Sequence, residues 1–247
     1  MSGVIFKKRT IIVTGASRGL GREIAVRFGK SGSRVVVNYL SRKTEAADVA
    51  EVIAQAGGEA MLFQADIGKA HEVDAMMLAA TRKWKTIDVL VNNAGMTKDG
   101  LLLRMSEQNW DMVINTNLTG PFYCIRAASA LMSRQRCGHI INISSIVGAQ
   151  GREGQANYAA SKAGLIGLTR ACAIELGGFN ISVNAVLPGY MPTDMGSSAS
   201  GAIRERVLKE NALQRISDPI EIAEFIYQLS LMNNVSGQVF NLDSRIV

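Results

Sequence analysis

Short apolar runs alternate along the chain with amphipathic segments, and this alternation constrains the fold more than any other feature. The runs are apolar nearly throughout, which is typical of strands buried on both faces of a parallel sheet. The segments between them place their apolar residues on one helical face. We therefore predict a single α/β domain over residues 1–247, a doubly wound seven-stranded parallel sheet with helices on both faces.

The bounds of the expected elements follow from the same pattern. Asp218 and Pro219 suit the N-cap and first turn of the last helix, and the pair Gly177-Gly178 should end the helix before it. The expected strands are Thr10–Thr14, Arg34–Asn38, Ala60–Gln64, Val89–Asn92, His139–Ile143, Ser182–Val186 and Gln238–Asn241. The expected helices are Gly21–Lys30, Glu45–Ala56, His71–Trp84, Glu107–Arg134, Asn157–Leu176, Ile203–Glu210 and Pro219–Leu231.

Composition excludes several classes of protein. Hydrophobic residues make up 47% and charged residues 19% of the 247 residues, so the chain can bury a large core. No apolar stretch is long enough to cross a bilayer, and the N-terminus lacks the apolar run of a secretory signal, so no membrane partner is expected. Three cysteines without a CxxC pair and only two histidines argue against a metal site. They fit the cytoplasm or another reducing compartment.

The net charge of +6 narrows the choice of partner. A basic surface can attract nucleic acid, an anionic membrane or a phosphorylated small molecule. The chain has no block of five like charges. A solvated basic surface is therefore the first interpretation and a phosphate-rich cofactor the second, and we expect no nucleic-acid partner.

A glycine-rich turn, TGASRGLG, joins the first expected strand to the first expected helix. Glycine permits a tight turn and a close approach of the backbone to a ligand. The helix N-terminus offers unpaired N–H groups and a partial positive charge to a pyrophosphate. This position in an α/β chain favours a dinucleotide site over a purely structural turn. The expected binding residues here are Gly15, Ser17, Arg18, Gly19, Leu20 and Gly21.

The second expected strand ends without an acidic residue. A dinucleotide site commonly has an acid there to bind the ribose 2′-hydroxyl, but this segment reads VVVNYLSRK and offers Asn38, Ser41 and Arg42. Arg42 and Arg18 would suit a 2′-phosphate, because a guanidinium binds phosphate through two hydrogen bonds. We therefore expect NADP(H) rather than NAD(H). In the alternative, Arg42 simply points into water.

Tyr158 and Lys162 form a candidate acid–base pair. They are four residues apart in an expected helix and so share one face. A nearby ammonium favours the phenolate and should lower the pKa of the tyrosine from its usual value of about 10. A Tyr-x-x-x-Lys spacing is common by chance, so the pair gains weight only from other polar residues that the fold brings to it.

Further polar residues follow the ends of neighbouring strands. Ser144 and Ser145 come directly after one apolar strand, and Asn93 follows another. Ligands of open α/β sheets bind outside such carboxyl ends. Asn117 lies in an otherwise apolar helical segment, where it is either functional or a hydrogen-bonded core amide.

Taken together, TGASRGLG, NNAG, Ser145 with Tyr158-x-x-x-Lys162, and Leu187-Pro188-Gly189 resemble the short-chain dehydrogenase/reductase family over essentially the whole chain. Within it, the segments GQANYAASKAGLIGLTR, NNAGMTKDGLLLRM and PGYMPTDM are most similar to β-ketoacyl-(acyl carrier protein) reductases. The resemblance implies a Rossmann fold and an NADP-dependent oxidoreductase that reduces a 3-oxoacyl thioester in fatty-acid synthesis.

The resemblance also implies a role for each candidate residue. Tyr158 would protonate the carbonyl oxygen, Lys162 would lower the pKa of Tyr158 and hold the nicotinamide ribose, and Ser145 would bind the carbonyl oxygen. Asn117 would hold a water that connects Lys162 to solvent. A segment at about residues 190–215 would form a substrate lid. The remaining implied cofactor residues are Asp66, Ile67, Asn93, Ala94, Gly95, Pro188, Gly189, Met191 and Thr193.

Two departures from the family pattern concern partners. Asp243 is followed by Ser244-Arg245 instead of two glycines, in a tail that commonly lies at a subunit interface of the expected homotetramer. Phe179 stands where members that use acyl carrier protein often have a basic residue, although Arg134 and Arg136 are basic candidates near the rim of the site. An acyl-CoA substrate, another ketone or alcohol, and a non-catalytic cofactor-binding subunit stay open as alternatives.

Overall fold

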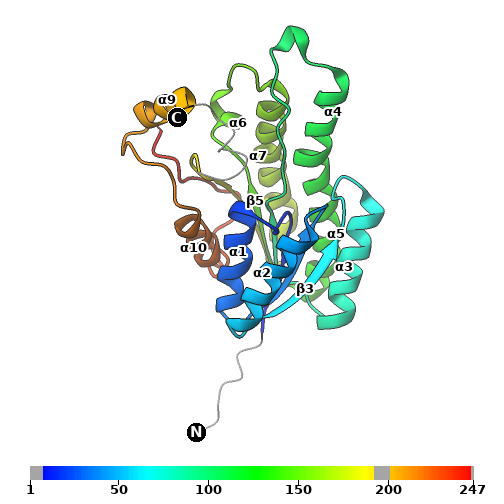
Figure 1. The fold of residues 1–247 in the computed structure, drawn as a ribbon. Helices are drawn as coiled ribbons and strands as arrows, with labels where there is room; N and C mark the ends of the chain where they lie inside the picture. The colour runs from blue at the N-terminus through cyan, green and yellow to red at the C-terminus, as the bar shows by residue number, and fades with distance from the viewer. Residues whose placement is uncertain (1–7, 192–200, 246–247) are drawn as a thin grey trace.

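The computed structural model describes residues 8–191 and 201–245 and contains a seven-stranded parallel sheet in the order β3-β2-β1-β4-β5-β6-β7 (Figure 1). The order reverses between β1 and β4, so the predicted doubly wound architecture is confirmed. The strands lie close to their predicted positions. They are β1 (Thr10–Val13), β2 (Arg34–Tyr39), β3 (Glu59–Gln64), β4 (Val89–Asn92), β5 (Gly138–Ile143), β6 (Ile181–Leu187) and β7 (Val239–Asn241).

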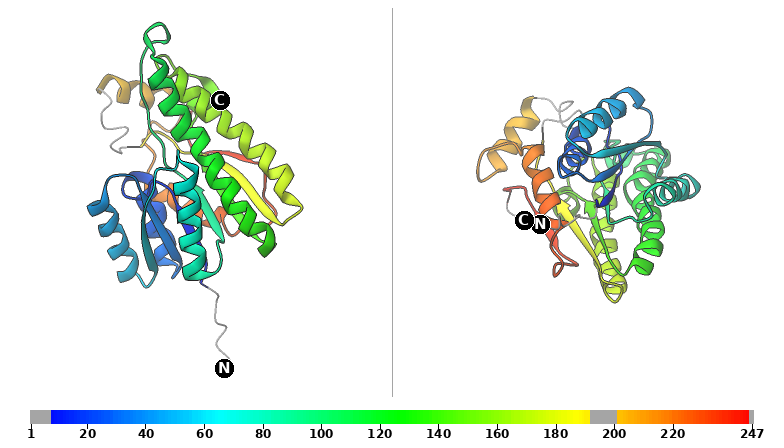
Figure 2. Two further views of the ribbon diagram at one scale, coloured as in Figure 1. Left: turned by 90° about the vertical axis from the view of Figure 1, so that its right-hand side faces the viewer. Right: turned by 90° about the horizontal axis from the view of Figure 1, so that it is seen from below.

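Helices cover both faces of the sheet. One face packs against α1 (Gly19–Lys30), α2 (Lys43–Gln55) and α10 (Pro219–Leu229). The other face packs against α3 (Ala70–Trp84), α5 (Gly120–Gln135) and α7 (Ala156–Gly177), of which α5 and α7 lie side by side in Figure 2.

The period of two along each strand divides the apolar residues between these two cores. In β1, Ile11 and Val13 belong to the core beneath α1, whereas Ile12 belongs to the core beneath α5. All three side chains are fully buried. Burial on both faces explains why the strands read as continuous apolar runs.

The helix predicted over Glu107–Arg134 is interrupted. It consists of α4 (Glu107–Ile114), a π-helical turn over Asn115–Thr119, and α5. In the π turn, Gly120 N donates to Asn115 O, five residues back. A Cβ at Gly120 would lie 2.8 Å from Ile67 Cδ1, so the start of α5 packs directly on the segment after β3.

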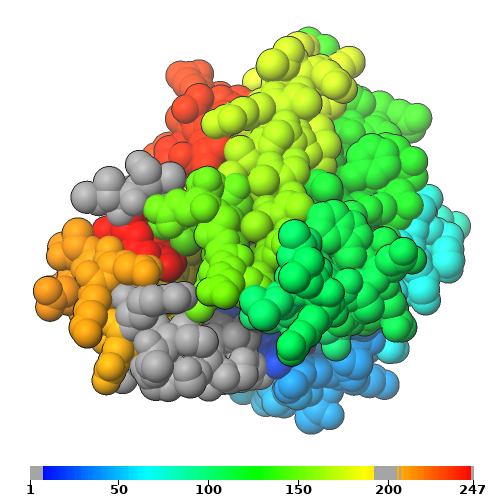
Figure 3. Space-filling view, turned by 90° about the horizontal axis from the view of Figure 1, so that it is seen from above, coloured from blue at the N-terminus to red at the C-terminus, as the bar shows by residue number. Residues whose placement is uncertain are grey.

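The remaining helices lie toward the carboxyl edge of the sheet. A short helix, α6 (Val147–Gln150), follows β5 and was not predicted, and α9 (Gly201–Glu210) precedes α10. The Asp218 side chain accepts a hydrogen bond from Ile220 N at 2.8 Å, which confirms the predicted cap of α10. Figure 3 shows this edge from above, with the segment of α9 (orange) and the segment of α4 (green) on opposite sides. Within the described ranges, no helix is both long and apolar enough to cross a bilayer.

A partly buried histidine joins the amino ends of two strands. His139 Nδ1 of β5 lies 2.8 Å from Ser182 Oγ of β6. Burial and the nearby positive charge of Arg9 lower the pKa of His139 to about 4. The folded protein therefore holds this imidazole neutral under conditions in which an unfolded chain would begin to protonate it.

We expect the protein to lose stability below pH 6.5 because of His139. Between pH 6.5 and about 4 the unfolded state binds more protons at this site, so the free energy of unfolding falls as the pH falls. The wild type should lose about 2 kcal/mol more than His139→Asn between pH 7 and pH 4. Urea unfolding at both pH values, at one protein concentration, measures this. The exposed His71→Asn is the control; equal losses in all three proteins would contradict the expectation.

Candidate active site

A cleft of about 420 Å³ opens at the carboxyl edge of the sheet. It contains most of the residues predicted from the sequence, although these come from six separate segments. The predicted residues that line it are Gly15, Ser17, Arg18, Gly19, Leu20, Gly21, Asn38, Ser41, Arg42, Asp66, Ile67, Asn93, Ala94, Gly95, Tyr158, Lys162, Pro188 and Met191.

The glycine-rich turn requires glycine for steric reasons. Gly15 has a φ of +62°, and a Cβ there would lie 2.9 Å from Ala94 Cα. A Cβ at Gly21 would lie 2.3 Å from Gly15 O. Among the described residues, no side chain caps the N-terminus of α1. Its backbone N–H groups and the positive end of its dipole therefore face the cleft and suit a phosphate group.

Two asparagines fix this turn from the flanking strands. Asn38 Oδ1 accepts a hydrogen bond from Gly15 N at 3.1 Å, while its amide donates to Phe63 O and Ala65 O. From the other side, Asn93 Nδ2 donates to Thr14 O and Gly15 O. Asn38 lines the cleft but is only 2% exposed, and both ends of its amide bond to protein, so it positions the turn; its predicted contact with the cofactor stays a prediction.

No acidic residue ends the second strand, but the structure brings a carboxylate to Arg42 from the helix that follows. Arg42 Nη1 donates to Glu45 Oε1 at 3.0 Å, and Arg18 is close enough to help lower the pKa of Glu45. Glu45 lies in the first turn of α2, beyond the strand end at which a dinucleotide site commonly has its acid. Because both partners of the Arg42–Glu45 pair are exposed, the pair is weak and leaves the guanidinium able to exchange partners.

Tyr158 and Lys162 face the cleft from one side of α7. Lys162 Nζ lies 5.7 Å from the centroid of the Tyr158 ring. Burial and the negative charge of Asp99 raise the pKa of Tyr158, and the nearby Ser145 hydroxyl lowers it only in part. In the resting site desolvation therefore dominates the pKa of Tyr158, and its lowering by Lys162 stays a prediction.

Lys162 is held in place by the strand beside it. Its ammonium donates to Ile143 O at the end of β5 at 2.7 Å, and its side chain is almost completely buried. Burial lowers the pKa of Lys162 to about 8. Ser144 Oγ donates to the backbone oxygen of Lys162 at 2.9 Å, so Ser144 positions the helix while its neighbour Ser145 reaches the phenol.

Asn117 lies behind the wall of the cleft, in the π turn. Its Oδ1 accepts from Met96 N at 2.8 Å, and its Nδ2 donates to Met96 O and Ser161 Oγ. A Cβ built on Gly95 would lie 3.4 Å from Asn117 Oδ1 and 3.7 Å from Lys162 Nζ. Asn117 is thus close to Lys162, but its side chain is already bonded to protein. The role of Asn117 in holding a water that connects Lys162 to solvent stays a prediction.

Several other predicted residues either do not line the cleft or lie outside the described residues. Gly189 is packed beneath the cleft wall against Ser217, and Thr193 lies outside the described residues. Arg134 and Arg136 end and follow α5, so they lie at the amino end of β5, opposite the cleft. The prediction that they lie near the rim is wrong, because a helix that precedes a parallel strand must return to the amino edge.

Some residues of the cleft lining were not predicted as binding residues. Thr116 comes from the π turn, and the others lie at or just after strand ends, where only the general rule that carboxyl ends bind ligands could have signalled them. Besides Thr116 they are Leu40, Ala65, Met96, Ile143 and Ser144, of which Ser144 was noted only for its place after a strand.

We expect Lys162→Met to stabilise the protein. The pKa of Lys162 in the folded protein is about 8, against 10.5 for an ordinary lysine. Below pH 8 the buried ammonium therefore lowers the free energy of unfolding by its full amount. This cost disappears as the pH rises from 8 to 10.5. At pH 7 the variant should gain about 1–2 kcal/mol in free energy of unfolding, and the gain should shrink as the pH rises. Denaturant titrations at pH 7 and pH 10 measure it, with Lys43→Met as the exposed control. A loss of stability at pH 7 would contradict it.

Comparisons with known proteins agree with this geometry. The family model described as short chain dehydrogenase matches residues 9–203. A 3-oxoacyl-[acyl-carrier-protein] reductase of Staphylococcus epidermidis is 47% identical over 95% of this chain and 97% of its own length. Another, from Synechocystis, is 46% identical over 96% of each chain. A solved structure described as a short-chain alcohol dehydrogenase from Sinorhizobium meliloti has a TM-score of 0.91 and 32% identity, over 96% of this chain and 95% of that one. The chain belongs to the short-chain dehydrogenase family.

Proposed function

We propose that this enzyme reduces a 3-oxoacyl thioester to the 3-hydroxyacyl thioester with NADPH, as in fatty-acid synthesis. The observation that carries the proposal is one cleft with Tyr158 and Lys162 at one end and the glycine-rich turn with Arg18 and Arg42 at the other. The relatives at 46–47% identity are named for this reduction. The acyl group is carried by acyl carrier protein or by coenzyme A.

The residues present fit the dinucleotide. The turn Gly15–Gly21 has no space for side chains at its closest approaches and places the N-terminus of α1 at the cleft, where the pyrophosphate would bind. Arg18, Ser41 and Arg42 would bind the 2′-phosphate, and Asp66 and Ile67 would contact the adenine. Pro188 and Met191 would contact the nicotinamide, beside Tyr158. Bound NADPH supplies the hydride, and the protein supplies orientation and a proton.

Tyr158 supplies that proton. Because its pKa is raised, the phenol is protonated at neutral pH and can donate to the carbonyl oxygen as the carbonyl carbon gains the hydride. Ser145 binds both the phenol and the developing negative charge on that oxygen. Lys162 holds the nicotinamide ribose and stabilises the phenolate that the transfer leaves behind. The net reaction consumes NADPH and one proton and gives the alcohol and NADP⁺.

We also propose a homotetramer in a reducing compartment, with residues about 190–215 acting as a substrate lid. Large apolar side chains remain exposed on α4 and α5, among them Trp110, Met112 and Phe122, and Ile174 on α7 is 84% exposed. Such residues are expected to be covered in an assembly. The mass in solution, by light scattering, tests this point.

Tyr158→Phe tests the chemistry. The variant lacks the transferable proton, so kcat with acetoacetyl-CoA should fall at least about a thousandfold, while the NADPH dissociation constant stays within about twofold. Tyr123→Phe, on α5, is the control. Retained turnover would refute the role of the phenol.

A panel of substrates tests the alternative functions. Carrier-bound substrates and simple ketones together separate a thioester reductase from a reductase of another ketone. NADPH binding without turnover of any substrate would support the non-catalytic alternative.

Arg18→Ala/Arg42→Ala tests the choice of cofactor. Loss of two guanidinium groups at the expected 2′-phosphate position should lower kcat/KM for NADPH about 10–100-fold and leave that for NADH within about threefold. Lys43→Ala, which removes a neighbouring exposed charge outside the cleft lining, should change neither value. Parallel losses for the two cofactors would place the 2′-phosphate elsewhere.

A further inference from the structure

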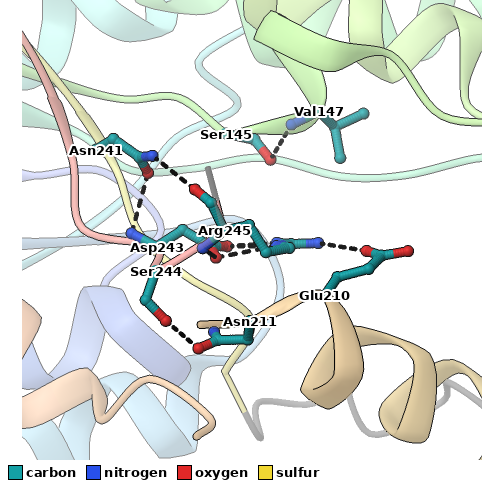
Figure 4. A network of polar contacts seen from close by, with 8 residues as sticks. All are labelled: Ser145, Val147, Glu210, Asn211, Asn241, Asp243, Ser244 and Arg245. Atoms are coloured by element: carbon teal, nitrogen blue, oxygen red, sulfur yellow. Dashed lines mark hydrogen bonds and ion pairs between the residues drawn. The ribbon is translucent and has the colours of Figure 1, made fainter. Parts of the chain in front are cut away.

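The chain segment after β7 forms a compact polar network (Figure 4). The Asp243 carboxylate is fully buried and accepts hydrogen bonds from Arg245 N at 3.0 Å and Arg245 Nε at 2.9 Å. Asn241 closes the loop, because its Oδ1 accepts from Asp243 N and its Nδ2 donates to Arg245 O. The buried carboxylate thus holds the tail Ser244–Arg245 in one conformation.

The same tail binds the segment that follows α9. Ser244 O accepts from Ala212 N at 3.2 Å, and Ser244 Oγ bonds both Leu213 N and Asn211 Oδ1. Arg245 Nη1 also lies 3.9 Å from Glu210 Oε2, in the last turn of α9. Residues 210–213 are therefore attached to the tail by backbone and side-chain contacts together.

Segment 211–217 in turn packs on the residues after β6. Ser217 N donates to Tyr190 O at 2.9 Å. A Cβ at Gly189 would lie 1.8 Å from Ser217 Oγ and 3.5 Å from Asp243 Cα, so only glycine fits between them. Gly189 therefore transmits the position of segment 211–217 and of the tail directly to its neighbours.

Those neighbours form one wall of the cleft. Pro188 and Met191, on either side of Gly189 and Tyr190, line the same cleft as Tyr158, and Pro188 follows β6, which pairs with β5. Arg18, in the glycine-rich turn after β1, and Arg42, after β2, line the cleft on the other side of β4 in the sheet order. The tail, which follows β7 and packs on Gly189, thus lies on the β6 side of the cleft.

We propose that Ser244 and Arg245 are positioning residues that act through Gly189 to set the wall against which the nicotinamide half of the cofactor binds. The proposal rests on the proposed function for the identity of that cofactor. A tail that only fastens the edge of the sheet would support all parts of the cleft alike. A tail that sets this wall affects the nicotinamide half and leaves the adenosine half unchanged.

The test compares NADPH with adenosine 2′,5′-bisphosphate, which has only the adenosine half, by fluorescence and calorimetric titration. In Arg245→Ala the dissociation constant of NADPH should rise about tenfold and that of adenosine 2′,5′-bisphosphate should stay within about twofold. The control, Arg82→Ala on α3, removes an exposed arginine and should change neither constant.

Two further variants guard against a folding defect. Ser244→Ala keeps the pair of Asp243 and Arg245, and Arg245→Lys keeps a positive charge beside the buried carboxylate. Both should show the same selective effect, about threefold for NADPH. The proposal would be overturned if, in all three tail variants, the dissociation constants of both ligands rose equally or neither of them rose.

The proposed function can fail separately. A wild-type protein that binds NADPH but reduces no 3-oxoacyl thioester would refute the reaction while the binding comparison still decides the role of the tail. If the wild-type protein binds adenosine 2′,5′-bisphosphate and NADPH with equal affinity, the wall at the nicotinamide half contributes nothing to binding. That result would overturn the proposal on the tail.

Discussion

The buried hydrogen bond from Lys162 to Ile143 O is the interaction on which the rest of the site depends. It joins the helix that carries the proposed acid–base pair to the end of a central strand. The burial that it requires makes the ammonium expensive to hold, as its pKa of about 8 shows. This unfavourable charge lies where the cleft, the phenol and the glycine-rich turn meet. The stability supplied by the two hydrophobic cores offsets its cost.

A second buried network keeps α7 in register with the sheet. Asn92 Nδ2 of β4 donates to Asn142 Oδ1 of β5 at 2.8 Å, and Asn142 Nδ2 donates to Thr169 Oγ1 of α7 at 2.9 Å. All three residues are buried. An apolar contact between helix and strand can slide, whereas directional bonds in a nonpolar core are satisfied in only one register. Together with the Lys162 bond, this network defines where Tyr158 lies relative to the strand ends.

The sequence predicted the elements and the membership of the cleft well, because both depend on local patterns. Continuous apolar runs mark strands buried on two faces, and polar residues directly after them must lie at the carboxyl edge. What depends on packing in three dimensions was not predictable. The bonding of Asn117 to Met96, the carboxylate that Glu45 brings to Arg42, and the location of Arg136 at the opposite edge are set by elements distant in sequence. The same holds for the Tyr158 pKa, since spacing along a helix reports proximity but not desolvation.

Burial shifts the pKa values of Tyr158 and Lys162 in opposite directions. Burial keeps the phenol of Tyr158 protonated and draws the pKa of Lys162 toward neutrality, so each group is held away from its charged form. In the proposed reaction Tyr158 donates a proton. This step needs a neutral phenol and a nearby group that stabilises the negative charge left on it. The transfer creates that charge, and the ammonium 5.7 Å from the ring then becomes favourable where it was costly before. In the proposed reaction, part of the electrostatic cost of the resting site is therefore relieved when the phenolate forms beside the ammonium.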